Sequence, residues 1–158
     1  MPSVVYPSPA VPGPIQVSVE VPADWVTEAA PGVAFVAASP TEIGGVHTNI
    51  VLSVRRIDAE LGLDQVAEMV AEELASLPTC TEPTVGHQRI GDRDCAVLSY
   101  QFDGPEAGSS IYQIQAVCVA QVTERLSDAV TLTLTHGTGI DSMELDSLRE
   151  IIASMRVG

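Results

Sequence analysis

The stretch from residue 84 to residue 136 constrains the fold most, because strand patterns follow one another there with only short polar connections. No helical periodicity separates these patterns, so neighbouring strands are expected to pair as antiparallel hairpins. The turn Gly91-Asp92-Arg93-Asp94 and a glycine-containing loop at residues 103–109 make the first two connections. The sequence therefore predicts a β-meander whose four strands span residues 84–90, 95–102, 110–122 and 129–136.

The first part of the chain adds three predicted strands, at residues 15–21, 33–38 and 48–57. The first of these alternates apolar with polar residues, which is typical of a half-buried strand. Strands grouped apart from helices favour an α+β fold over alternating β-α-β units. We therefore predict an antiparallel sheet of six to seven strands packed with two main helices.

Two amphipathic segments are predicted to form those helices. Asp64 is expected to cap the first, whose apolar stripe is Val66, Met69, Val70, Leu74 and Leu77. Asp141 and Glu144 form a D-x-x-E capping pattern before the second. Its stripe is Leu145, Leu148, Ile151, Ile152 and Met155.

The length of 158 residues fits one domain, which we place at residues 15–158. Residues 1–14 contain five prolines and are predicted to form an extended N-terminal extension.

The charge balance excludes several functions. The formal net charge is −14 and the chain has seven arginines but no lysine. Schiff-base chemistry, pyridoxal phosphate attachment and P-loops all need a lysine. An acidic surface also repels phosphate backbones and anionic lipids. We expect no cofactor, no nucleic-acid partner and no membrane partner.

The three cysteines, Cys80, Cys95 and Cys118, are widely spaced. An odd number at such spacing predicts neither a disulfide framework nor a zinc cluster, and it fits a reducing compartment. The N-terminus has no secretory signal pattern, and no apolar run is long enough to span a membrane. The sequence predicts a cytoplasmic protein, or a secreted protein or lipoprotein only if a signal was removed.

The hairpin at residues 103–109 permits a register prediction. Centring it on residue 106 sets Tyr100 opposite Tyr112, with Leu98–Ile114 and Ala96–Ala116 on the same, core-facing side. In the next hairpin Leu132 and Leu134 join that side. In this register Cys95 and Cys118 point to opposite faces of the sheet.

The other face is then polar without being charged. It would carry Ser99, Gln101, Gln113, Gln115, Thr131, Thr133 and Thr135. Such a face is either a solvated sheet of good strand formers or a surface that binds a protein partner without desolvating charges.

Catalytic motifs are weak. His47, His87 and His136 lack the spacing of a zinc site, G-x-S-x-G is absent, and Cys80 has no base near it in the sequence. No metal site and no enzymatic activity are predicted. An enzyme, namely a hydrolase or thiol enzyme that uses Cys80 or His136, is kept only as an alternative hypothesis for function.

The opening segment Val21-Pro22-Ala23-Asp24-Trp25 resembles the P-x-x-W signature of PsbP-like (Mog-type) domains. The order of elements, down to a last helix ending near Ser154-Met155-Arg156, is most similar to the actinobacterial LpqN/LpqT family. The resemblance implies an α/β/α sandwich and a non-catalytic binding, assembly or chaperone-like adaptor role. The chain lacks the lipobox cysteine of the LpqN-type lipoproteins.

Two functions follow as expectations. The first is a non-enzymatic protein-binding or adaptor module that uses the uncharged polar face, with a homodimer through that face as a variant. The alternative is a small-ligand pocket between the sheet and its helices, near Trp25, Tyr100 and Tyr112.

Overall fold

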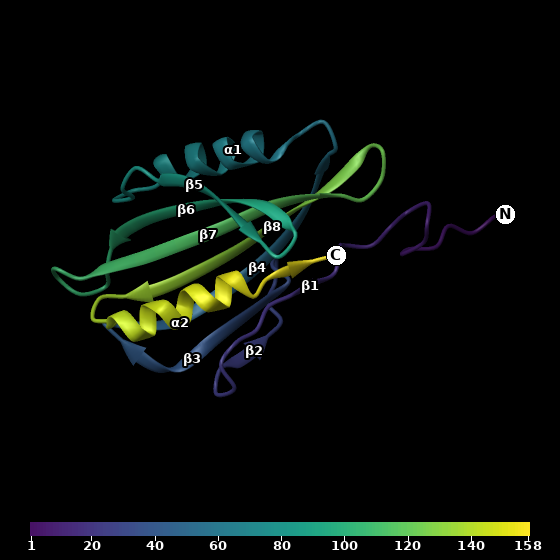
Figure 1. Ribbon diagram of the computed structural model, residues 1–158. Helices are drawn as coiled ribbons and strands as arrows, with labels where there is room; N and C mark the ends of the chain where they lie inside the picture. Colours follow the sequence, from purple (N-terminus) through teal and green to yellow (C-terminus); the bar gives the residue numbers. More distant parts are fainter.

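The computed structural model describes residues 1–158 and contains one large antiparallel sheet, one short ribbon and two helices (Figure 1). The strand order of the seven-stranded sheet is β2-β3-β4-β8-β7-β6-β5. Its strands are β2 (Val26–Glu28), β3 (Phe35–Ile43), β4 (Val46–Asp58), β5 (Thr84–Ile90), β6 (Arg93–Asp103), β7 (Ser110–Gln121) and β8 (Leu126–Gly137). The ribbon pairs β1 (Val17–Ser18) with β9 (Arg156–Val157). The predicted α+β class is confirmed.

The two helices, α1 (Leu63–Ala75) and α2 (Ser142–Ala153), cover opposite faces of the sheet (Figure 1). Under α2, Leu148, Ile151 and Ile152 pack with sheet residues such as Ile50 and Leu132 in a cluster of 16 buried residues. The cluster under α1 has only eight buried residues, among them Val66, Leu74, Leu98 and Tyr100. The sheet is therefore packed on both sides, but unequally. We refer to these sides as the α1 face and the α2 face.

The helix caps differ between the two helices. In α2 the predicted capping box is confirmed. The Asp141 carboxylate accepts a hydrogen bond from the Glu144 amide at 2.8 Å, and the Glu144 carboxylate accepts one from the Asp141 amide at 3.2 Å. In α1 the prediction was wrong, since Gly62 is the N-cap residue and Asp64 lies in the first turn. The Gln65 side chain accepts from the Gly62 amide at 2.7 Å. Neither helix has the length and apolar composition of a membrane-spanning helix.

The strand predictions are most accurate where apolar and polar residues alternate over a long segment. β5 has the predicted bounds, and β7 and β8 differ from prediction only at their ends. β3 continues past Ser39-Pro40 through an irregularity between Ala38 and Glu42. The exposed three-residue strand β2 was not predicted, and only β1 of the predicted strand at residues 15–21 is paired. Short edge strands carry too few residues for a periodic signal.

The predicted register is confirmed for β7–β8 and wrong for β6–β7. In the first pair Ala116 lies opposite Leu132, and Gln115 opposite Thr133. In the second pair Tyr100 lies opposite Gln113 instead of Tyr112, a shift of one residue. Because β7 keeps its predicted register with β8, the shift turns every β6 side chain to the face opposite the predicted one.

The loop between β6 and β7 explains the shift. The last strand pair is Asp103–Ser110, and the Gly104 amide donates to the Ser109 carbonyl at 2.8 Å. The Ser109 hydroxyl also accepts from the Glu106 amide at 3.1 Å and donates to the Glu106 carbonyl at 2.7 Å. A Cβ at Gly104 would collide with Ser109, so the close turn depends on glycine. The hairpin is thus centred half a residue later than predicted.

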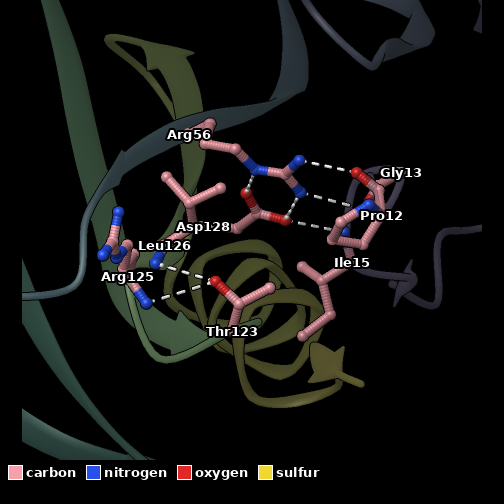
Figure 2. A network of polar contacts seen from close by, with 8 residues as sticks. All are labelled: Pro12, Gly13, Ile15, Arg56, Thr123, Arg125, Leu126 and Asp128. Carbon is pink, nitrogen blue, oxygen red and sulfur yellow. Dashed lines mark hydrogen bonds and ion pairs between the residues drawn. The ribbon is translucent and has the colours of Figure 1, made fainter. Parts of the chain in front are cut away.

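A partly buried ion pair fixes the N-terminal extension to the sheet (Figure 2). Asp128 on β8 is 1% exposed and binds the Arg56 guanidinium through contacts of 3.0 and 3.3 Å. Arg56 also donates to the carbonyls of Pro12 and Gly13, at 2.6 and 2.9 Å, and Asp128 accepts from the Ile15 amide at 2.8 Å. The extension is therefore held from Pro12 onward.

Candidate binding groove

A groove of about 770 Å³ lies between α1 and the part of the sheet that α1 leaves uncovered. α1 packs mainly over β6 and β7, so the α1 face of β8 and β4 stays open on one side of it. The floor includes Gln113 and Gln115 of β7 with Thr131 and Thr133 of β8. We call this space the groove.

The floor consists of uncharged hydrogen-bonding groups that are only half buried. The Gln115 amide donates to the Tyr100 hydroxyl at 2.7 Å, and the Gln113 amide donates to the Thr135 hydroxyl at 3.0 Å. Each glutamine amide still has donor and acceptor capacity beyond its one bond. The floor can therefore hydrogen-bond a molecule that enters the groove.

Tyr100 supports this floor from beneath α1. Its side chain is buried against the α1 cluster and meets Phe102 edge to face, with ring centroids 5.5 Å apart. Burial raises the pKa of Tyr100 to about 12, although the hydrogen bond from Gln115 acts in the opposite direction. The hydroxyl therefore stays neutral and holds the Gln115 side chain in place.

The wall of the groove is apolar and comes from α1 and Phe102. Val66 and Leu74 point into the core, as the predicted stripe requires. Met69 and Leu77 belong to the same stripe, yet they are 51% and 42% exposed. The stripe is wider than the sheet surface that α1 covers, so part of it faces the groove.

The charge of the groove differs from that of the whole protein. Its charged lining residues are Arg55, Arg56, Asp58 and Glu73, which together carry no net formal charge. The Arg55 side chain has no ion pair and no hydrogen bond within the chain. The groove therefore lacks the net negative charge that the protein carries as a whole.

Five of the seven residues predicted for the uncharged polar face lie together on the α1 face, and the other two lie on the opposite face of the sheet. Gln113, Gln115 and the three threonines share the α1 face. Ser99 and Gln101 lie opposite Ile114 and Tyr112, on the α2 face, because of the one-residue shift. The prediction missed the wall and rim residues Met69, Leu77, Phe102 and Arg55. The α1 stripe contained the signal for the wall, but its exposure depends on where the helix docks.

The three aromatic residues proposed for a ligand pocket do not meet. Tyr100 lies under α1, whereas Tyr112 stacks on His136 at 5.1 Å on the other face. Trp25 packs on the α2 side, where it lines a cavity of about 170 Å³ with Leu148 and Ile151. The predicted pocket lined by these three aromatic residues is therefore not formed. A pocket between the sheet and a helix does exist, at the groove.

The residues considered for catalysis lie at separate sites. His47 contacts Glu42 at 3.7 Å, His87 contacts Asp64 at 3.0 Å, and His136 contacts the Gly137 carbonyl at 2.9 Å. Burial raises the pKa of the Cys80 thiol, whose sulfur contacts the Thr81 carbonyl. No three histidine, cysteine or acidic side chains gather in a geometry that could hold a metal ion.

Comparison with solved structures identifies the fold. The chain superimposes on LpqN of Mycobacterium tuberculosis with a TM-score of 0.73 and 14% identity, covering 92% of this chain and 85% of LpqN. LpqN is described as involved in cell envelope biogenesis. A Bacteroides thetaiotaomicron protein matches with a TM-score of 0.55 and 22% identity, over 90% of this chain but 45% of its own.

These likenesses define a class of protein, namely an α+β sandwich with an antiparallel sheet between two helices. Within that class the chain has an LpqN-like fold, which confirms the predicted resemblance at the level of structure. No family model and no curated protein matches the sequence.

Proposed function

We propose that this chain is a non-catalytic binding protein that holds an uncharged, partly apolar segment of a partner protein in the groove. The observation that carries the proposal is the pairing of exposed Met69 and Leu77 with the half-buried glutamine and threonine floor. An apolar wall beside neutral hydrogen-bonding groups suits a peptide segment, which presents both kinds of surface.

The energetics favour a neutral occupant. Burying neutral amides and hydroxyls against matching partners costs far less desolvation free energy than burying charges. Covering Met69 and Leu77 adds a favourable hydrophobic contribution, on the order of 25 cal/mol per Å² of apolar surface removed from water. The four charged residues of the lining cancel in sign, so they do not select a strongly cationic partner.

The setting of this function is proposed by analogy with LpqN, which is involved in cell envelope biogenesis in M. tuberculosis. We propose that this chain contributes its groove to an envelope-related process. Fractionation of cells that make the chain, followed by detection in the envelope or the cytosol, tests this part. Recovery solely in the cytosol would contradict it.

The test of the groove is a double variant, Met69→Glu with Leu77→Glu. Both side chains are exposed, so the free energy of unfolding is expected to change by less than about 1 kcal/mol. Two carboxylates on the wall would face desolvation on binding, and capture of a partner from native lysate is expected to disappear.

The matched control is Met143→Glu on α2, where the side chain is 79% exposed and outside the groove. A protein retained by the wild type and by this control, but lost from the double variant, would support the proposal. Retention by all three proteins would exclude the groove as the binding site. If a second copy of the chain is the occupant, sedimentation shows a dimer that the double variant abolishes.

A small neutral ligand is the second candidate, because the groove volume of about 770 Å³ falls in the usual range for ligand pockets. Trp25 is a poor reporter, since it packs on the α2 side. We would use Phe102→Trp in a Trp25→Phe background, which places the fluorophore in the wall. Native mass spectrometry of the purified protein separates a small bound mass from a partner polypeptide.

A further inference from the structure

Two of the three cysteines face each other across the sheet. In the β6–β7 pairing Ala96 lies opposite Val117, so the next pair along the strands is Cys95 and Cys118. Both thiols are free and belong to the α2-face core, with 1% and 0% of their surface exposed. The sequence-based register had placed them on opposite faces.

The backbone geometry suits a covalent link. Directly opposite residues of an antiparallel pair have Cα atoms about 4.5 or 5.5 Å apart, depending on the hydrogen-bonding position. Both spacings lie within the range of roughly 4.4–6.8 Å that a disulfide spans. The pairing also affects ionisation, because the neighbouring Cys118 thiol lowers the pKa of Cys95, whereas the Cys95 thiol and burial raise the pKa of Cys118.

We propose that Cys95 and Cys118 are a disulfide-forming pair that crosslinks β6 to β7 beneath α2. The oxidant is a disulfide, either of a small thiol or of a protein oxidoreductase. The Cys95 thiolate attacks one sulfur of that disulfide, giving a mixed disulfide and releasing the first thiol. The Cys118 sulfur then attacks the Cys95 sulfur and displaces the second thiol.

The step balances. Two protein thiols are oxidised to one disulfide, one oxidant disulfide is reduced to two thiols, and the two protons leave with the released thiols. Because both sulfurs are buried, exchange takes place while the hairpin is open, during folding, and is slow in the native protein. Once formed, the bond is shielded from reductants by the α2 core.

The crosslink would also fix the groove. Only the observed register places the two sulfurs on one face, since a slip of one residue turns one of them away. The same slip would turn Phe102 of the wall, and Tyr100 that holds Gln115, away from the groove. The bond therefore locks the hairpin in the register that the groove requires. It also removes the basis for the reducing-compartment prediction, because that prediction treated the cysteines as unpaired.

The test is refolding of the full chain carrying Cys80→Ser in buffer with oxidised glutathione as the probe. Thiols are then alkylated in denaturant and the protein is weighed and mapped by peptide mass spectrometry. We expect both thiols to be lost, a mass lower by two hydrogen atoms, and one crosslinked pair of peptides containing Cys95 and Cys118. Free thiols after refolding, or glutathione left attached, would overturn the proposal.

Two further measurements distinguish a disulfide that fits the native fold from one that forms by chance during refolding. The oxidised chain is expected to melt roughly 5–10 °C above the reduced chain, since a crosslink in native geometry restricts the unfolded state. A lower melting temperature for the oxidised form would contradict the native fit. Cys95→Ala and Cys118→Ala, each in the Cys80→Ser background, are the matched controls. Neither variant can form the crosslink, so the oxidant should not raise its melting temperature, even if glutathione stays attached to the remaining thiol.

Discussion

The two faces of the sheet share the same strands but are packed very differently. The α2 face has 16 buried residues, nearly all aliphatic or sulfur-containing, and α2 together with the N-terminal segment covers it. The α1 face has eight buried residues and an open groove with a polar floor. Residues one apart along β8, such as Leu132 and Thr133, therefore lie in opposite environments. The comparison shows that the α2 face holds the larger apolar core, whereas the α1 face leaves a groove open to solvent.

The largest expected effect contrasts Leu132→Ala with Thr133→Ala. Leu132 is fully buried, so truncation leaves a cavity and should lower the free energy of unfolding by about 2–5 kcal/mol. Thr133 borders the groove, and its truncation should cost less than about 1 kcal/mol. Urea denaturation of both variants measures the difference. Equal costs would show that the α1 face is as tightly packed as the α2 face.

A smaller effect distinguishes the two helices. Asp141 caps α2 through the Glu144 amide, so Asp141→Ala should lower the free energy of unfolding by about 1 kcal/mol. Asp64 caps nothing in α1 and contacts the exposed His87, so Asp64→Ala should cost less than about 0.5 kcal/mol. Thermal unfolding of the two variants checks the order. A larger loss for Asp64→Ala would reverse the assignment of caps.

A similarly small effect at neutral pH is expected for Tyr100→Phe. Gln115 loses its partner but borders the groove, where water can replace the hydroxyl, so the cost is about 0.5 kcal/mol. Burial raises the folded-state pKa of Tyr100 to about 12 from an ordinary value near 10. As the pH rises from 10 toward 12, the unfolded state loses the proton first, and the wild type loses stability that the variant keeps.

Urea denaturation between pH 8 and pH 11.5 tests this crossing, and tyrosinate absorbance follows the ionisation. The variant should begin slightly less stable than the wild type and approach or exceed it at the alkaline end. Parallel stability curves over the whole range would mean that Tyr100 is no more buried than an ordinary surface tyrosine.

Much of the fold could be predicted from periodicity alone. The alternation of Leu132 and Leu134 with threonines defined both the strand β8 and its register with β7. The D-x-x-E pattern at Asp141 located the start of α2. These predictions succeeded because local hydrogen bonding and an apolar stripe act on neighbouring residues, whatever the rest of the chain does.

The candidate site could be predicted only in part. The uncharged row of Gln113, Gln115, Thr131, Thr133 and Thr135 was found, because alternate residues of a strand share a face. The wall was not found, because exposure of Met69 and Leu77 depends on where α1 docks. The error over Ser99, Gln101 and Tyr100 came from centring the β6–β7 hairpin half a residue too early.

By itself, the sequence determined the element types, the antiparallel meander, the acidic character and the apolar stripes, since each depends on residues close together in the chain. Tertiary structure decided the β6–β7 register, the unequal cover of the two faces and the meeting of Cys95 with Cys118. A β-strand with apolar residues on both sides has two acceptable registers. The choice was made by the closure of the Gly104–Ser109 loop and by two helices that bury both faces.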